Sequence, residues 1–481
     1  MQARCRIGRS PALVLLMTLS VAVPLEGQDE WRPFETSAQR VVPALESLAK
    51  WCGSKRLFGE RSEVHDLILE FDPDHLPSRR LLGYRRQRDG GWKRRASWRR
   101  PRMAKAEVVE LATRREAAVG EFVDATLEGI AARREKLGST RCRVLLERLL
   151  RMAPGDPGIH DALGEVAWKG RWVLKESVAA SKRARELAQA AARFMRSAST
   201  PVPSTATRLD SQIGLDWTGA REAGSVRVVG TVPTEEVESA VRLSLASRAL
   251  FEKAFGVKVS FPKDYVVYLL GGAGDGNTFI DRYPGMSPEY RRFARRLVCV
   301  WAPARWHAAS WSGHAATRME WVGRLALALF LRRDLNVKTS HGALYEGLSV
   351  YLSHLLVGTR FTWTVDRSTY GAGHDDWRDR LTKKGADWFQ EARDLVAKGR
   401  RPDYPALLGK RVNDFTIEDL VHAYVFGAYL LEARPHGWRK LLTHVGRGLH
   451  HAEAVRKAMG LGVKELEDRV LRWLEERAIV Q

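Results

Sequence analysis

Two stretches in the second half of the chain decide its fold: Met319-Glu-Trp-Val-Gly-Arg-Leu-Ala-Leu-Ala-Leu-Phe330 and Ser340-His-Gly-Ala-Leu-Tyr-Glu-Gly-Leu-Ser-Val-Tyr-Leu352. Long apolar runs without proline predict helices over about 315–333 and 342–357. Around Glu346 the second helix carries the small residues Gly342, Ala343, Ser349 and Ser353. We therefore expect another helix to approach it closely.

Strands and further helices are expected outward from this pair. Runs rich in β-branched and aromatic residues predict strands over Ser225–Gly230, Tyr265–Leu270 and Leu297–Trp301, and Thr234–Phe255 predicts a helix. Later helices are expected over about 376–398, 416–433, 437–448, 451–459 and 464–478. The glycine-rich stretch 271–276 lacks a following Gly-Lys-Ser/Thr, so we interpret it as a flexible loop near a cleft and not as a phosphate site.

The first half contains two segments that repeat each other. The first reads Leu69-Glu-Phe-Asp-Pro73, Leu82-Gly-Tyr84 and Asp89-Gly-Gly-Trp92, and the second reads Leu150-Arg-Met-Ala-Pro154, Leu163-Gly-Glu165 and Lys169-Gly-Arg-Trp172. Each predicts a helix, a proline turn, a helix and a Gly-Trp turn, a rhythm that loosely resembles tetratricopeptide-type repeats. Such stacks offer surfaces to protein partners.

The domain organisation follows from a change in composition. Long helices are expected over 104–136 and 176–196, and a Ser/Thr/Pro-rich stretch then breaks every pattern. We therefore expect a helical, repeat-like region over 30–196, a linker over 197–210 and a mixed α/β domain with a helical C-terminal part over 211–481. The predicted fold class is α+β.

The N-terminus has the pattern of a secretory signal. Three arginines precede the uncharged run Ala12–Val23, and Ser20-Val-Ala22 offers small residues for cleavage after Ala22. A retained membrane anchor is the alternative, although the run is short for a bilayer. No other uncharged run reaches membrane length. We expect residues 1–22 to be removed and the protein to be exported, to the periplasm, the cell envelope or the outside.

Positive charge is the main compositional bias. The formal net charge is +22, which attracts polyanions. Between Arg79 and Arg102, eleven of 24 residues are basic, only Asp89 is acidic, and Trp92 and Trp98 lie among them. Three interpretations stay open: a solvated face, a site for an envelope polyanion, or a nucleic-acid site, the last being the least favoured.

The stretch around Glu346 resembles the gluzincin zinc peptidases, whose signature reads roughly Glu-Gly-Leu-Ala-x-Tyr and supplies the third zinc ligand. The likeness covers about residues 220–478, and the earlier segments resemble regions attached to such domains in planctomycete-like exported proteins. It implies a zincin-like fold, with Glu320 in the place of the general base. Met319 and Gly323 then stand where the two zinc histidines belong. Tyr424 matches a later helix tyrosine that faces the site in some relatives.

The missing histidines weaken the metal site that the resemblance implies. A catalytic zinc needs three protein ligands, and glycine has no ligand atom. A second alignment retains His314 but loses the glutamate and the other histidine. We therefore expect no cofactor, with Glu320 and Glu346 as relics and the protein acting as a non-catalytic binding or scaffold module. The alternative is a zinc hydrolase with the unusual ligands His314, His341 and Glu346.

Two arrangements are open for the remaining carboxylates. In the first, Glu346 and Glu320 are buried, and Arg318 or Arg324 replaces the zinc charge through a guanidinium–carboxylate pair. In the second, Glu320 pairs with Arg324 one turn away on a solvent-facing side of the helix.

Overall fold

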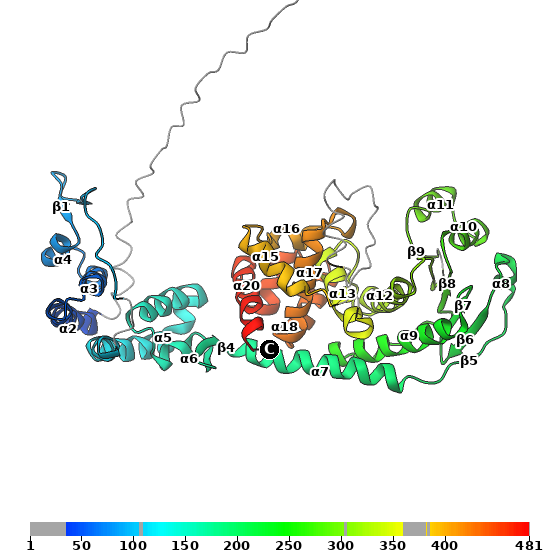
Figure 1. Ribbon diagram of the computed structural model, residues 1–481, viewed down its shortest axis with the longest axis horizontal. Helices are drawn as coiled ribbons and strands as arrows, with labels where there is room; N and C mark the ends of the chain where they lie inside the picture. The colour runs from blue at the N-terminus through cyan, green and yellow to red at the C-terminus, as the bar shows by residue number, and fades with distance from the viewer. Residues whose placement is uncertain (1–34, 105–108, 303–304, 359–380, 382–384, 481) are drawn as a thin grey trace, which may run out of the picture. The chain divides into compact units, whose positions relative to one another are not determined.

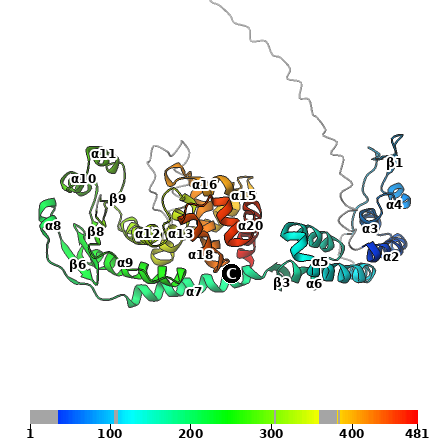
Figure 2. The same ribbon diagram turned by 180° about the vertical axis from the view of Figure 1, so that it is seen from behind.

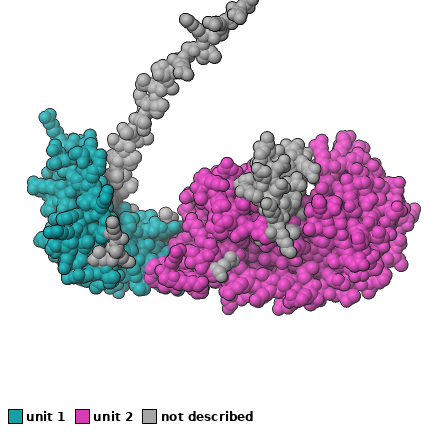
Figure 3. Space-filling model, viewed as in Figure 1, with its two compact units in different colours: residues 1–166 teal, residues 167–481 magenta. Residues whose placement is uncertain are grey.

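The computed structural model describes residues 35–104, 109–302, 305–358, 381 and 385–480. Over these residues the chain is α+β and 64% helical, with small sheets. The expected signal segment, residues 1–22, lies outside them. The chain divides into two compact units, Met1–Val166 and Ala167–Gln481 (Figure 3).

This division differs from the expected boundary at 197–210, because helix α7 (Lys175–Ser197) belongs to the second unit. The buried face of α7 consists largely of small residues: Ser177, Ala180, Ser181, Ala184, Leu187, Ala190 and Ala191. This face lets α7 run close beside α9 (Thr234–Phe255), as both views show (Figures 1 and 2). An amphipathic pattern identifies a buried face but not the core that the face joins.

The first unit is built on three helices: α2 (Glu35–Ser54), α3 (Phe58–Phe71) and α5 (Val109–Met152). Their apolar faces form one core. The backbone of α5 breaks at Gly138, where φ is 74°. Because only glycine adopts this conformation without strain, the long helix changes course there.

The two repeated segments share one order of elements. After the proline turn come the short helices α4 (Leu76–Leu81) and α6 (Pro157–Ala162). Gly83 and Gly164 follow with φ of 77° and 78°. Each Gly-Trp turn then lies in a two-stranded sheet, made of β1 (Tyr84–Arg86) with β2 (Trp92–Arg94), or of β3 (Glu165–Trp168) with β4 (Arg171–Leu174). Tetratricopeptide-like stacking stays a prediction.

The second unit contains a six-stranded sheet of order β5-β6-β7-β8-β10-β9. Its strands are β5 (Val202–Pro203), β6 (Gly219–Ala223), β7 (Val226–Gly230), β8 (Val266–Leu269), β9 (Cys299–Trp301) and β10 (His307–Ser310). The central strands β7, β8 and β10 are parallel, whereas β6 and β9 pair antiparallel with their neighbours. Within the described sheet, β9 is therefore an edge strand.

Helices form the rest of the second unit. They are α8 (Arg208–Ile213), α10 (Ala273–Arg282), α11 (Pro288–Ala294), α12 (Ala315–Asp334), α13 (Gly342–Val357), α15 (Trp388–Ala397), α16 (Tyr404–Gly409), α17 (Ile417–Glu432), α18 (Gly437–Gly446), α19 (His451–Met459) and α20 (Val463–Val480). The helix expected over about 376–398 begins at residues that the structure does not describe, 376–380 and 382–384.

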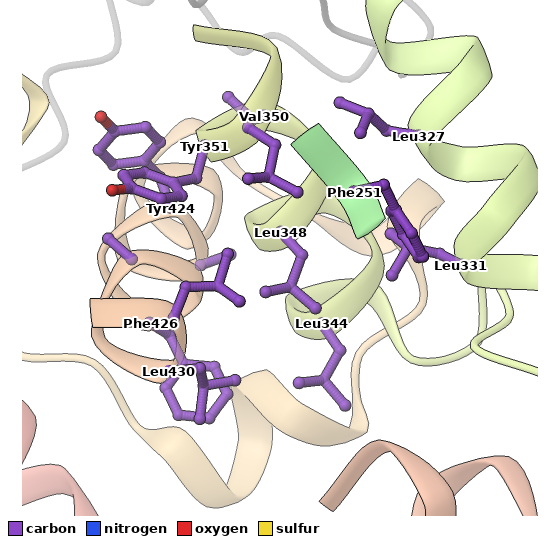
Figure 4. Packing of buried hydrophobic residues seen from close by; sticks show 14 of the residues in the cluster. Phe251, Leu327, Leu331, Leu344, Leu348, Val350, Tyr351, Tyr424, Phe426 and Leu430 are labelled. Carbon is purple, nitrogen blue, oxygen red and sulfur yellow. The ribbon is translucent and has the colours of Figure 1, made fainter. Parts of the chain in front are cut away.

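Helix α13 lies at the centre of this core. Its side chains Leu344, Leu348 and Val350 lie between α17 and α12 (Figure 4). Gly347 permits the close crossing with α17, because a Cβ atom there would overlap the carbonyl oxygen of Ala423. The facing Gly427 has the same constraint, since its Cβ would lie 2.5 Å from the carbonyl carbon of Gly347.

A buried carboxylate from α20 caps the start of α7. Glu476 accepts hydrogen bonds from the Leu174 backbone N–H at 3.0 Å and from the Ser177 hydroxyl at 2.6 Å. The Ser181 hydroxyl also donates to the Val480 carbonyl at 3.2 Å. Negative charge at a helix N-terminus is favourable, so these contacts fasten the last helix to the first helix of this unit.

The expected linker is partly built into the sheet. β5 pairs with β6, and the Thr207 side chain caps α8 in a reciprocal capping box with Asp210. The buried Asp210 carboxylate also binds Arg227 of β7 at 2.5 Å. Burial alone would raise the pKa of Asp210, but the hydrogen bonds and charge of Arg227 and the bonds from Thr207 bring this pKa below its ordinary value.

Replacing Asp210 with asparagine should lower the free energy of unfolding by about 2–3 kcal/mol at neutral pH, because hydrogen bonds to an ionised group contribute about 1.5–3 kcal/mol. A carboxyl with a depressed folded pKa stabilises above its unfolded pKa, and this stability is lost as the pH falls through the folded value. Urea unfolding at pH 7 and pH 3 should therefore show the larger deficit at pH 7. Asp281→Asn, at a half-exposed ion pair, is the control. An equal deficit at both pH values would contradict the prediction.

The glycine-rich stretch after β8 is not a loop over its whole length. Helix α10 begins at Ala273, inside it. The Asp275 carboxylate accepts a hydrogen bond from the Gly271 backbone N–H at 3.2 Å and also bonds the Thr231 hydroxyl. A side-chain carboxylate therefore lies at this helix start, where a bound phosphate would be placed in a nucleotide site.

Candidate functional site

The candidate site is an apolar cleft of about 210 Å³ between β9, α12 and α13. Its wall includes Cys299, Val300 and Trp301 of β9, Trp321, Arg324, Leu325 and Ala328 of α12, and Tyr345, Glu346 and Ser349 of α13. Residues of α11 and the turn at Val412 and Asn413 complete it. These are the two helices and the last expected strand of the sequence analysis, and the structure brings them together.

Helix α12 carries apolar residues on most of its surface, which fits its position between several neighbouring elements. It packs against α9, α13 and β10, and residues 320–331 are all buried. Gly323 faces α13, where a Cβ atom would lie 3.4 Å from the Ser353 hydroxyl. The Ser353 hydroxyl also donates to the Glu320 carbonyl at 3.4 Å. The small face around Glu346 therefore serves two crossings, one with α12 and one with α17.

A buried ion pair joins the two site helices. The Arg324 guanidinium of α12 bonds the Glu346 carboxylate of α13, and their side chains are only 3% and 4% exposed. The guanidinium also lies 5.1 Å from the centre of the Trp321 ring, a cation–π arrangement. Glu320, one turn before Arg324, is 1% exposed. The structure thus has the buried arrangement and not the solvent-facing one.

Arg318, the other arginine considered, has a different partner. It forms a two-pronged ion pair with Glu236 in the first turn of α9, with both N···O distances at 2.7 Å. A third N–H donates to the Ser312 carbonyl at 2.5 Å. Arg318 therefore ties α12 to α9 and leaves Arg324 as the cation beside Glu346.

The structure does not bring the candidate histidines to the cleft. His314 is exposed at the N-cap of α12 and makes no side-chain cap. His341 precedes α13 and lines a separate cavity of about 150 Å³, together with His450 and His451. Burial and the charge of Lys338 lower the pKa of His341. The alternative zinc set of His314, His341 and Glu346 is therefore not assembled.

Tyr424 also lies away from the cleft wall. It is 1% exposed and packs in an aromatic cluster with Tyr351, Trp388 and Phe389, with ring centres 5.1–5.7 Å apart. Tyr351 in turn donates to Glu432 at 2.5 Å. Burial raises the pKa of Glu432 to about 7, against the opposing effect of Arg477. The expected site tyrosine is thus a core residue here.

The donor set does not fit a catalytic zinc. Within the described ranges, no group of three or more His, Cys, Asp or Glu side chains is placed to hold a metal ion. At the positions that the resemblance assigns, Met319 is a half-buried thioether and Gly323 has no side chain. The remaining carboxylate, Glu346, is bound by a guanidinium, whose positive charge would repel a divalent cation.

Several residues of the cleft were not predicted as site residues from the sequence. The buried indole N–H of Trp321 has no hydrogen-bond partner among the described residues. Phe293 of α11, at the cleft, is 46% exposed. Burial raises the pKa of Tyr345 and of Cys299, so both groups are neutral at pH 7. Their aromatic and sulfur character was visible in the sequence, but the shared cleft depends on the tertiary fold.

Comparison with known proteins adds no assignment. No family model matches the chain, and no curated protein and no solved structure matches it. In the part of the chain that the structure describes, no helix is both long and apolar enough to cross a membrane.

Proposed function

We propose that the second unit is a non-catalytic binding module of an exported protein, with a gluzincin-like cleft in which an arginine stands in for the metal. The observation that carries the proposal is the Arg324–Glu346 ion pair in the cleft wall. A guanidinium neutralises the glutamate that would otherwise bind zinc. It cannot acidify a water molecule as zinc does, so the cleft retains a shape for binding without the means for hydrolysis.

The occupant that fits is an extended peptide segment with apolar side chains. All three residues of β9 line the cleft, and an edge strand can pair with an added strand through backbone hydrogen bonds, here beside the Trp301 carbonyl that already accepts from the Tyr290 hydroxyl. Apolar residues, among them Phe293 and Leu325, line the cleft and would receive alternate side chains of such a peptide. The Trp321 indole N–H has no acceptor among the described residues, and a ligand carbonyl that reached it would supply one, because leaving a buried donor without an acceptor costs free energy.

Selection of randomised, display-bound octapeptides on the mature protein tests the binding role. Apolar peptides should be enriched, and Phe293→Asp should weaken binding of the selected peptides by at least about tenfold, because it removes the exposed apolar rim and adds charge. Phe58→Asp is the matched control, since Phe58 is 50% exposed and Phe293 is 46% exposed. Equal loss in both variants, or no enrichment, would remove support for a peptide cleft.

Metal analysis and a peptidase assay test the non-catalytic part. Protein equilibrated with zinc and then dialysed should retain far less than one zinc per chain, and it should leave the selected peptides intact. One tightly held zinc that Glu346→Gln releases would overturn the proposal. So would peptide cleavage that Glu320→Gln abolishes.

A further inference from the structure

We propose that the β1–β2 hairpin of the first unit binds a linear phosphate-bearing polymer, an activity separate from the peptide cleft of the second unit. Residues 79–102, called the basic hairpin here, contain ten arginines and one lysine but one acid. The structure places this charge on a short, exposed two-stranded sheet and its flanks.

One face of the basic hairpin alternates arginine with aromatic rings. Cross-strand partners on this face are Tyr84 with Arg94, and Arg86 with Trp92. The Arg94 guanidinium lies 4.7 Å from the centres of both the Tyr84 and the Trp98 ring. Arg79 lies 4.5 Å from the Tyr84 ring. These contacts hold the guanidinium groups in place before any ligand binds, which reduces the entropy lost on binding.

The opposite face places like charges directly across the strands. Arg85 pairs in register with Lys93, and both side chains are exposed. Like charges in such a cross-strand pair destabilise a sheet. Asp89, the only acid of the hairpin, accepts a hydrogen bond from the Gly91 backbone at 2.9 Å, which stabilises the turn. An anion bound at this face would relieve the repulsion.

Most cations of the basic hairpin have no acidic partner in the part of the chain that the structure describes. Arg94 and Arg100 form ion pairs with Asp66. No ion pair to another described residue is formed by Arg79, Arg80, Arg85, Arg86, Arg88, Lys93, Arg95, Arg99 or Arg102. These nine cations, which lack an ion-pair partner among the described residues, make a strongly positive local field around a small sheet.

The aromatic rings of the basic hairpin favour a polymer that is recognised through its charge and not through stacked bases. Nucleic-acid bases stack on free aromatic faces. Here guanidinium groups already cover the Tyr84 and Trp98 rings, and the indole N–H groups of Trp92 and Trp98 donate to Asp74 and the Leu81 carbonyl at 2.7 and 3.1 Å. The guanidinium fork, in contrast, matches phosphate oxygens. A chain of phosphates without bases is therefore the best fit.

Binding of long-chain inorganic polyphosphate to the mature protein tests the proposal. The association constant should fall steeply with salt, with a slope of roughly −0.7 for each contacted phosphate. The double variant Arg85→Ser with Lys93→Ser should weaken binding roughly tenfold at low salt and flatten this slope by roughly 1.4. The matched control removes two exposed cations of the second unit, Lys398→Ser with Arg401→Ser, and should leave binding nearly unchanged.

Three outcomes would overturn the proposal. Equal loss in the control pair would mean that net charge and not the hairpin binds. Unchanged binding in the hairpin variant, with folding confirmed by circular dichroism, would exclude this face. Tighter binding of a single-stranded oligonucleotide than of polyphosphate of the same charge would show that bases contribute, and would replace the proposed polymer with a nucleic acid.

Discussion

Replacing Arg324 with methionine should lower the free energy of unfolding at pH 7 by about 3–5 kcal/mol, the usual cost of removing one partner of a buried ion pair. Methionine matches much of the arginine stem but leaves the buried Glu346 carboxylate without this cation. Glu346 should then protonate more easily. The deficit should therefore shrink at pH 5, which urea unfolding at the two pH values measures.

Two further variants make this prediction specific to the ion pair. Adding Glu346→Gln to Arg324→Met removes the carboxylate that Arg324 neutralises, so the double variant should recover most of the lost stability at pH 7. Arg332→Met, at an exposed position two turns later on α12, should cost less than about 0.5 kcal/mol. A deficit for Arg324→Met as small as that of Arg332→Met would refute the structural role of the pair.

Replacing Gly347 with alanine should destabilise the second unit by at least about 3 kcal/mol, the upper end of ordinary overpacking. The added methyl group would meet the Ala423 carbonyl oxygen, and a backbone atom cannot turn aside as a flexible side chain can. The helices α13 and α17 would have to separate. Thermal unfolding followed by circular dichroism measures the loss.

Gly274 provides the matched control, because it lies in α10 with no atom within 4 Å of its Cβ position. Gly274→Ala should stabilise by up to about 1 kcal/mol, since alanine favours the helix more than glycine does. Gly427→Ala should resemble Gly347→Ala, and the two losses should not add, because either methyl group forces the same separation. If Gly347→Ala changes the stability as little as Gly274→Ala does, the close crossing of α13 and α17 is refuted.

Elements with a long periodic pattern could be predicted from the sequence. The bounds of α9 and α13 agree with Thr234–Phe255 and 342–357 to the residue. Short strands were missed: Gly219–Ala223 and His307–Ser310 contain alanine, glycine and charged residues, and they are strands because the neighbouring strands offer hydrogen bonds. Tertiary context decides such segments, since their own preferences are weak.

The candidate site was predictable only in part, because its contacts also depend on the tertiary fold. Buried helices and the choice of arginines near Glu346 could be stated from the sequence, and Arg324 is the one that pairs with it. The sequence could not separate Arg324 from Arg318, because α9 supplies the competing carboxylate, Glu236, from 82 residues away. Nor could it place Tyr424, since the aromatic cluster around that ring draws on distant helices.

The capping of α7 by Glu476 has a consequence during protein synthesis. The start of α7 at residue 175 and its cap at residue 476 are separated by some three hundred residues of chain. A nascent chain on the ribosome lacks the cap until α20 has emerged, so the chain from α7 to α20 is synthesised before this contact can form. Until then the Leu174 backbone N–H and the Ser177 hydroxyl lack this acceptor, so the start of α7 is fixed only after α9, α13 and α17 can already pack against the helix.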